Sequence, residues 1–267
     1  MFASPLTADQ LARVYACWDS VNAARAANHD DMVAVALAHL SELAGAQNAW
    51  WLGAVRVSDA PADDPLNGWR PRRVRYLHSS PVDTAFAAQA TRQCDGPAVD
   101  ESVVAHTRGT GVFRAYLLRE IVSPAWYDSA FYDLAYRARD VHDCLFVITP
   151  VNADAESYFG FQRKGGHPAY ETADRDLLAH AMRGLQWLHR EALLTEGLAV
   201  ASKPLTPAER RVLAGLLTPR SEKEIAAWLG LSPRTTHHHV TEILRKFGVN
   251  SRTALMALWL GRNPAAG

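Results

Sequence analysis

Three consecutive histidines, His237, His238 and His239, are the side chains whose type and spacing first suggest chemistry in this chain. Histidine nitrogens are common ligands of zinc and other transition metals. Helix signals on both sides predict that the run is helical, so the three neighbours spread over about 200° around the axis and cannot meet at one ion. His238 and Glu242 have the spacing of helix neighbours, but two ligands make a poor metal site. We therefore expect no metal, no cofactor and no catalytic residues.

The histidine helix has two faces when each residue is advanced by about 100° around its axis. The apolar stripe, which we expect to be buried, contains Thr236, Val240, Ile243, Leu244 and Phe247. The opposite face contains Arg234, His238, Thr241 and Arg245, with His237 and a half-buried His239 on its flanks. Side chains on such a face can reach phosphates or base edges of DNA. The alternative, that the histidines are only solvated, stays open.

Helix signals divide the end of the chain into four short segments. Thr206–Glu209 combines an N-cap, a proline at the first helical position and a capping-box glutamate. Ser221–Glu224 is a second capping box, for a helix that ends at Gly230. Ser232–Gly248 holds the histidine helix, and Ser251–Leu260 a fourth. Two helices separated by a three-residue turn are typical of a helix-turn-helix, whose second helix can enter the major groove.

Charge is unevenly distributed, although the whole chain has 28 basic and 28 acidic residues. From Lys203 to Arg262 there are ten Lys or Arg and only four Asp or Glu. A basic end on an acidic remainder is typical of a part that meets a polyanion. Neither a secretory signal nor an apolar stretch of about 18 residues is recognisable, and the three cysteines are widely spaced. We therefore expect a cytoplasmic protein that does not bind a membrane.

The first 195 residues alternate helix and strand signals. Expected helices cover residues 7–25, 31–43, 81–94, 123–138 and 172–194, and expected strands cover 48–57, 74–78, 143–151 and 156–164. Residues 59–72 are rich in Pro, Asp, Asn and Gly and predict a surface loop. This order predicts an α+β domain, in which helices flank an antiparallel sheet, followed by an all-α domain of four helices.

Residues 205–255 resemble the LuxR-type helix-turn-helix domain in the pieces LTPAERRVL, EIAAWLGLSPRTT, HV, ILRKFGV and SRTAL. Two departures matter, because the family usually has a glycine where Pro219 stands and an aliphatic residue where Thr236 stands. The positions of His237 and His238 often carry Lys and Asn in the family, and these side chains help to choose the DNA sequence. The resemblance therefore does not predict the operator.

The resemblance implies roles for individual side chains. DNA contacts are implied for Arg234, Thr235, His237, His238, Thr241, Arg245 and Lys246, with Thr235 and Lys246 on phosphates. Dimerisation on a roughly palindromic site is implied for Leu255, Met256, Leu258 and Trp259, and we expect the helix over 172–194 to add Leu185 and Leu188. The expected partners are double-stranded DNA and a second copy of the chain, with RNA polymerase as a further candidate.

The segments SPAWYDSAFYDLAYRARDVHDCLFVITPV and YFGFQRKGGHPAYETADRDLLAHAMRGL are similar to the GAF-like sensors attached to many LuxR-type regulators. This similarity implies a GAF- or PAS-like antiparallel sheet with helices on one side and a small-molecule pocket between sheet and loops. Aromatic walls suit an apolar or planar ligand. The expected ligand-binding residues are Trp50 or Trp51, Trp126, Tyr127, Phe131 and Tyr132. Plain core packing is the alternative for each of them.

The front domain leaves two further interpretations open. It resembles an acyl-homoserine-lactone sensor loosely, through the aromatic and acidic pattern of SPAWYDSAFYDLAYRARDV, or it has no ligand and only mediates protein interaction. The chain shows no nucleophile elbow, phosphate loop or zinc spacing, so we expect no enzyme. The favoured prediction is a dimeric transcription regulator. Its ligand-sensing and dimerisation domain covers residues 1–195, its linker 196–204 and its LuxR-type domain 205–267.

Overall fold

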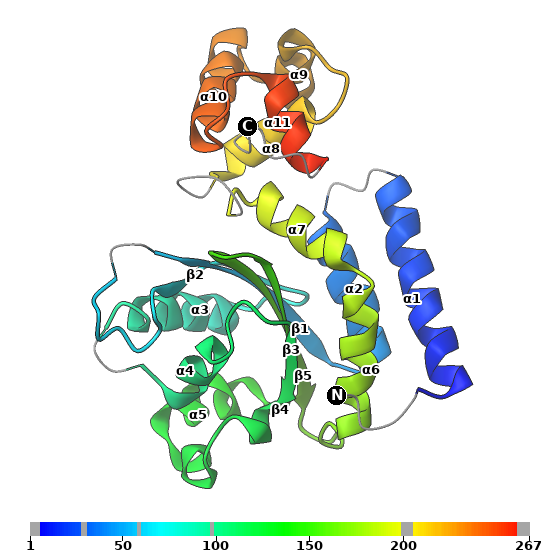
Figure 1. The fold of residues 1–267 in the computed structure, drawn as a ribbon, viewed down its shortest axis with the longest axis vertical. Coiled ribbons are helices and arrows are strands. Elements are labelled where there is room, and N and C mark those ends of the chain that lie inside the picture. The colour runs from blue at the N-terminus through cyan, green and yellow to red at the C-terminus, as the bar shows by residue number, and fades with distance from the viewer. Residues whose placement is uncertain (1–5, 28–30, 58–59, 97–98, 199–204, 261–267) are drawn as a thin grey trace. The chain divides into compact units, whose positions relative to one another are not determined.

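The computed structural model describes residues 6–27, 31–57, 60–96, 99–198 and 205–260. The chain forms two compact units, Met1–His189 and Arg190–Gly267, which we call unit 1 and unit 2 (Figure 1). The division falls within helix α7, Gln186–Thr195, which therefore contributes residues to both units. Residues 199–204 of the expected linker lie outside the described residues.

Unit 1 is built on a five-stranded sheet in the order β2-β1-β5-β4-β3, and every neighbouring pair is antiparallel. The strands are β1 Asn48–Arg56, β2 Trp69–Tyr76, β3 Arg114–Leu117, β4 Val141–Asn152 and β5 Ala155–Lys164. β4 and β5 form the predicted hairpin, in which Ile148 lies opposite Tyr158. The antiparallel sheet predicted for this part of the chain is thereby confirmed.

Strand β2 begins earlier than the sequence predicted. The loop expected to reach Arg72 ends before Trp69, which pairs with Arg56 and is buried. Pro71 is tolerated within β2 because this strand is at the edge of the sheet, where a missing amide donor breaks no ladder. The turn-forming residues correctly indicated a loop. They could not show where the loop ends, because the start of β2 is set by the burial of Trp69 against the sheet.

Helices cover both faces of the sheet (Figure 1). One face carries α2 Met32–Ala44 and α6 Thr172–Arg183, and α1 Ala8–Ala26 packs on the outside of these two helices. The other face carries α3 Pro81–Gln93, α4 Glu101–Thr107 and α5 Ala130–Ala135. The expectation of helices on one side only was therefore wrong. The short helices α3 to α5 form a second layer because their apolar side chains pack onto the sheet residues that face away from α2 and α6.

The aromatic segment expected as one helix over 123–138 consists of three short elements. They are the 3-10 turn η2 Pro124–Asp128, the helix α5 and the 3-10 turn η3 Arg137–Arg139. Ser129 divides the segment, because its backbone is extended and its hydroxyl caps α5 by accepting from the Tyr132 amide at 3.0 Å. The prediction of a single helix failed because it followed the aromatic-rich pattern and overlooked Ser129 as an internal helix cap.

The long helix expected over 172–194 is also broken, into α6 and α7. The indole of Trp18 packs against Gly184, where an added Cβ would come within 2.3 Å of the ring. The same indole donates its N–H to the carbonyl of Ala181 at 2.8 Å. A glycine weakens a helix and leaves room for this tryptophan, so the bend is set by a residue of α1 that is far away in the sequence.

Unit 2 contains the four predicted helices, α8 Pro207–Leu216, α9 Glu222–Leu229, α10 Pro233–Lys246 and α11 Arg252–Trp259. The capping boxes at Thr206 and Ser221 are both formed, and Gly230 ends α9 at a φ of 64°. The buried core contains Val212, Leu213, Leu216, Ile225, Val240, Ile243, Phe247, Leu255 and Leu258. Thr236 is buried among these helices as predicted, and its hydroxyl has no hydrogen-bond partner among the described residues.

Candidate functional site

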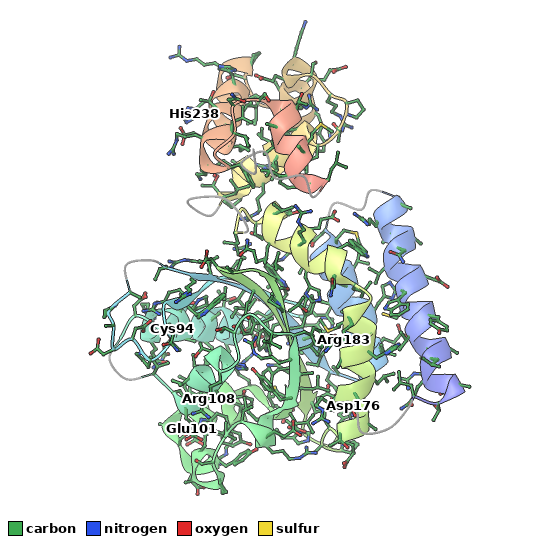
Figure 2. The ribbon with its side chains drawn as sticks, viewed as in Figure 1. Cys94, Glu101, Arg108, Asp176, Arg183 and His238 are labelled. Carbon is green, nitrogen blue, oxygen red and sulfur yellow. The ribbon has the colours of Figure 1, made fainter. Side chains whose placement is uncertain are left out.

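The outward face of α10 gathers most of the side chains predicted to contact DNA. Ser232 caps the helix by accepting from the Thr235 amide at 3.1 Å, which fixes where α10 begins. The predicted contacts that are exposed are Arg234, Thr235, His237, His238, Thr241 and Arg245. Figure 2 shows His238 on the outer side of the helix. The face therefore presents two guanidinium groups, imidazoles and hydroxyls, which are groups that bind phosphates and base edges.

Two of these exposed side chains have acidic partners within unit 2. Nδ1 of His237 lies 3.1 Å from Oε2 of Glu222 on α9, and the guanidinium of Arg245 lies 2.6 Å from Oε2 of Glu242. Both pairs are exposed, so water weakens them and either basic partner can exchange its carboxylate for a phosphate at small cost. His238 has no acidic contact of this kind in the described residues, and its ring lies 5.9 Å from that of His239.

Lys246 does not lie where the sequence predicted. Its ammonium group is buried and donates to Oε2 of Glu209 on α8 at 2.7 Å, so it joins α10 to α8 and cannot reach a phosphate in this conformation. Glu209 also accepts from the Thr206 amide at 2.6 Å as part of the capping box. Burial alone would raise the pKa of Glu209, but these hydrogen bonds outweigh it and hold the pKa below its usual value.

Most of the residues expected at a dimer interface are buried within the chain. Leu185, Leu188, Leu255 and Leu258 are all buried and pack inside their own chain. Leu255 and Leu258 belong to the core of unit 2, since they fall on the inner side of α11. On the outer side Met256 is exposed, and Trp259 is half-buried with its ring 5.5 Å from that of Phe247. Of the residues predicted at the dimer interface, Met256 and Trp259 are the two that keep surface that a second copy could cover.

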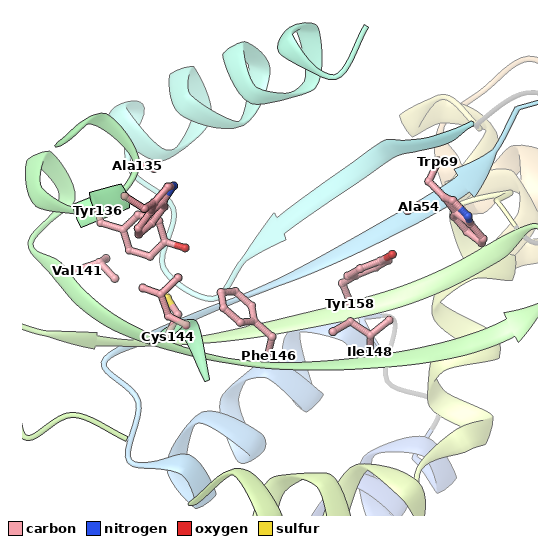
Figure 3. Packing of buried hydrophobic residues seen from close by; sticks show 11 residues of the cluster. Ala54, Trp69, Ala135, Tyr136, Val141, Cys144, Phe146, Ile148 and Tyr158 are labelled. Atoms are coloured by element: carbon pink, nitrogen blue, oxygen red, sulfur yellow. The ribbon is translucent and has the colours of Figure 1, made fainter. Parts of the chain in front are cut away.

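Unit 1 contains a cavity of about 160 Å³ between the sheet and helices α3 to α5. Figure 3 shows Phe146, Ile148 and Tyr158 rising from the same side of the sheet, with Trp69 near one end and Tyr136 near the other. The lining includes Trp50, Leu52, Trp69, Phe86, His106, Phe131, Tyr136, Phe146, Tyr158 and Gln162. The position of the cavity follows from the period of two in β1 and β5, which turns alternate residues to this face.

The predicted ligand residues divide into three groups. Trp50 and Phe131 line the cavity. Trp126, Tyr127 and Tyr132 pack in the aromatic cluster beside it but do not line it, and the indole N–H of Trp126 donates to Asp100 at 2.9 Å. Trp51 is fully buried on the opposite face, where its indole donates to Ser157 at 2.9 Å. We therefore exclude Trp51 from the cavity wall, because neighbours on a strand face opposite sides.

Sequence reasoning missed several wall residues. Phe146 and Tyr158 could have been found, since Phe146, Ile148 and Tyr158 lie at alternate positions of the two strands predicted as a hairpin. His106 and Phe86 could not, because nothing in the sequence of α3 or α4 shows which face of those helices meets the sheet. The cavity thus depends on long-range packing more than on any local motif.

The charged residues of the cavity wall are paired with carboxylates that do not themselves line the cavity. The guanidinium of Arg70 lies 3.0 Å from Asp64 and 2.9 Å from Asp95. Arg139 donates to Asp83 at 2.8 Å through its Nε. Beside the cavity, Arg114 and the fully buried Glu156 form an ion pair at 2.7 Å.

His106 of the cavity wall has no acidic partner in the described residues. Its Nδ1 lies 2.5 Å from the hydroxyl of Tyr116, and its ring packs edge-on against Phe146 with 4.7 Å between centroids. Burial, with a smaller contribution from the charge of Arg114, lowers the pKa of His106 to about 3. The imidazole is therefore neutral at physiological pH.

A second buried histidine lies on the other face of the sheet. Nδ1 of His189 on α7 lies 2.9 Å from the hydroxyl of Ser157, and Nε2 lies 3.2 Å from that of Thr149. Burial lowers the pKa of His189 to about 3. Across the described ranges, no group of three or more His, Cys, Asp or Glu side chains is placed to hold a metal ion. None of the helices within those ranges has the length and apolarity needed to cross a membrane.

Residues 203–259 match the family described as "Bacterial regulatory proteins, luxR family". The transcriptional regulatory protein MctR of Rhizobium johnstonii is 36% identical over 66 residues, which are 25% of this chain and 31% of MctR. The transcriptional regulatory protein UhpA of Salmonella typhimurium is 48% identical over 52 residues, which are 20% of this chain and 26% of UhpA. The chain thus spans less than a third of these relatives, and the match establishes a LuxR-family helix-turn-helix domain at its C-terminal end.

Among solved structures, SdiA in complex with octanoyl-rac-glycerol superposes with a TM-score of 0.48 at 12% identity. The match covers 97% of this chain and 96% of SdiA.

Proposed function

We propose that this chain is a sequence-specific, DNA-binding transcription regulator whose unit 1 senses a small molecule. The observation that carries the proposal is the exposed polar face of α10 within a LuxR-family helix-turn-helix domain. We assign ligand sensing to residues 1–195, a linker to 196–204 and DNA binding to 205–267. RNA polymerase remains a candidate partner of the DNA-bound form.

The arrangement of α9 and α10 supports the DNA-binding part of the proposal. Gly230, in the left-handed region, ends α9, and Ser232 starts α10 two residues later. In helix-turn-helix proteins the second helix enters the major groove with its N-terminal residues at the base edges. Arg234, His237 and His238 lie in that part of α10, so we assign them to base or nearby phosphate contacts. Thr235, Thr241 and Arg245 would contact the DNA phosphate backbone on either side of the major groove.

The cavity supports the ligand-sensing part. A concave apolar space lined by aromatic side chains and few polar groups is the usual form of a small-molecule site. A ligand there would influence DNA binding only if it favours one arrangement of the chain over another. Helix α7 is a physical route for such coupling, since it begins in unit 1, where His189 bonds to β4 and β5, and continues into unit 2.

We propose that two copies of the chain pair through the outer surface of α11 and bind DNA as a dimer. Met256 and Trp259 offer apolar area there. The two alternatives for unit 1 are an acyl-homoserine-lactone receptor and a ligand-free interaction domain. The presence of the cavity favours a ligand over the second alternative.

The proposal is tested by selecting duplex DNA from a random pool with the full-length protein. We expect enrichment of one sequence with two related half-sites. Arg234→Ala and His238→Ala should lower affinity for that sequence, whereas Arg211→Ala, which removes one charge from the exposed surface of α8, should change it little. A pool without enrichment, or equal losses in all three variants, would contradict the proposal.

A further inference from the structure

We propose that the cavity of unit 1 takes an uncharged molecule about the size of one aromatic ring, whose single polar group hydrogen-bonds to Nε2 of His106. This inference rests on the proposed ligand-sensing function and specifies the class of ligand. It is carried by three features of the wall, which are its volume, its charge balance and the state of His106.

The volume sets the size of the ligand. The cavity holds about 160 Å³, which is close to the volume of about 150 Å³ at which an apolar protein cavity accepts benzene. Its walls are formed by Trp50, Leu52, Phe86 and Phe146 among other apolar side chains. One ring with a short substituent fills such a space.

The charge balance sets the charge of the ligand. Arg70 and Arg139 are the wall residues with a full charge, and each is paired with a carboxylate. Neither guanidinium is left to neutralise a bound carboxylate. A charged ligand would lose its hydration without gaining a partner, which is strongly unfavourable in an apolar site.

His106 supplies the polar contact without adding charge. A neutral imidazole donates from one nitrogen and accepts at the other. Nδ1 is engaged with Tyr116, and Nε2 has no hydrogen-bond partner among the described residues. The edge-on packing against Phe146 holds the ring in place on α4. A ligand hydroxyl can serve Nε2 in either tautomer, since a hydroxyl both donates and accepts.

Three probes of nearly equal shape test the effect of ligand charge separately from the effect of the hydrogen bond to His106. Ethylbenzene, 1-phenylethanol and benzoate are titrated into the full-length protein, and binding is followed by calorimetry and by ¹⁵N signals of the histidines. We expect 1-phenylethanol to bind roughly 3- to 10-fold more tightly than ethylbenzene, the effect of one net hydrogen bond. Benzoate should bind at least about 100-fold more weakly than the alcohol.

Two variants identify the anchor. His106→Phe keeps a ring against Phe146 and should reduce the preference for the alcohol over ethylbenzene to about onefold. Tyr116→Phe removes the partner of Nδ1 but leaves Nε2, so it should retain the preference. In the unaltered protein the ¹⁵N signal of His106 should shift with 1-phenylethanol more than with ethylbenzene, which tests the contact even if His106→Phe does not fold.

The inference is overturned if benzoate binds as tightly as the alcohol, if none of the three probes binds, or if the preference survives in a folded His106→Phe protein. It is also overturned if an acyl-homoserine lactone binds more tightly than 1-phenylethanol, which would favour the lactone receptor. These outcomes differ from failure of the proposed function. If the proposed function were wrong, the unliganded protein would enrich no DNA sequence, whatever the cavity binds.

Discussion

The indole of Trp50 lies directly over Gly160, so closely that a Cβ at this glycine would come within 2.2 Å of the ring. The two residues face each other across β1 and β5. Glycine is therefore required at position 160 for a reason of packing and not of backbone conformation. Because Gly160 has no side chain, the Trp50 ring can pack directly on the backbone of β5, where it lines the cavity.

The first prediction follows from this contact. Gly160→Ala should push the indole into the cavity, destabilise unit 1 by about 1–3 kcal/mol through overpacking and weaken binding of a ring-sized probe. Chemical unfolding and a titration with 1-phenylethanol measure the two effects. Gly111→Ala is the control, since a Cβ there meets no atom within 4 Å, although its φ of 81° adds backbone strain. Unchanged probe binding in Gly160→Ala would show that Trp50 does not shape the cavity.

The second prediction concerns the buried pair between Lys246 and Glu209. Lys246→Met should destabilise unit 2 by about 3–5 kcal/mol, because it leaves a buried carboxylate without its cation. Hydrogen exchange of α8 and α10 amides in the full-length protein reports this loss. Adding Glu209→Gln to the variant should restore part of the protection. If Lys246 acted mainly on phosphates, Lys246→Met would weaken DNA binding without changing exchange.

The third prediction adds the pH dependence of the same pair. The folded-state pKa of Glu209 is lowered, so the pair stabilises the fold above the unfolded-state pKa of about 4.5 and loses this contribution as pH falls through the lower folded-state value. The protection of α8 amides, taken relative to the intrinsic exchange rate at each pH, should therefore fall in acid more steeply in the unaltered protein than in the Glu209→Gln/Lys246→Met protein. Parallel pH profiles for the two proteins would contradict this account.

The fourth prediction concerns His189, whose imidazole is buried and neutral. Its folded-state pKa is about 3, so below the unfolded-state value of about 6.5 the unfolded chain binds a proton that the folded chain does not. The free energy of unfolding of unit 1 should fall by about 1.4 kcal/mol per pH unit from this residue alone as pH drops below 6.5. In His189→Gln, which can still bond to Ser157 and Thr149, this part of the slope should vanish. Urea unfolding at a series of pH values measures the slope.

The fifth prediction concerns Thr236, the polar residue in the core of unit 2. Its hydroxyl is buried and finds no hydrogen-bond partner in the part of the chain that the structure describes, so Thr236→Val should stabilise unit 2 by about 1–2 kcal/mol. Slower exchange of α10 amides is the expected sign. Faster exchange in the variant would show that the hydroxyl has a partner in solution.

The parts of the fold that sequence predicted correctly are those with local causes. The caps at Thr206, Ser221 and Ser232 lie beside the helices that they start, and the hairpin of β4 and β5 needs only a short turn. The wrong predictions have distant causes. The break between α6 and α7 depends on Trp18, which bonds to a carbonyl 163 residues away.

The candidate site divides in the same way. Periodicity on α10 was sufficient to separate an exposed face from a buried stripe, but not to find that Lys246 pairs with a carboxylate 37 residues away. Alternation along β1 places Trp50 and Trp51 on opposite faces, yet only the packing of α3 to α5 decides which face encloses a cavity. Long-range pairing is what a single sequence does not reveal.

The central claim is that α10 reads a DNA sequence. Its most direct test is fluorescence anisotropy of the full-length protein on the selected duplex and on a duplex with the same bases in scrambled order. We predict at least about a 1,000-fold preference for the selected duplex, which falls by about 5- to 150-fold in Arg234→Ala and in His238→Ala while affinity for the scrambled duplex changes less. Equal affinity for the two duplexes, or an unaltered preference in both variants, would contradict the account.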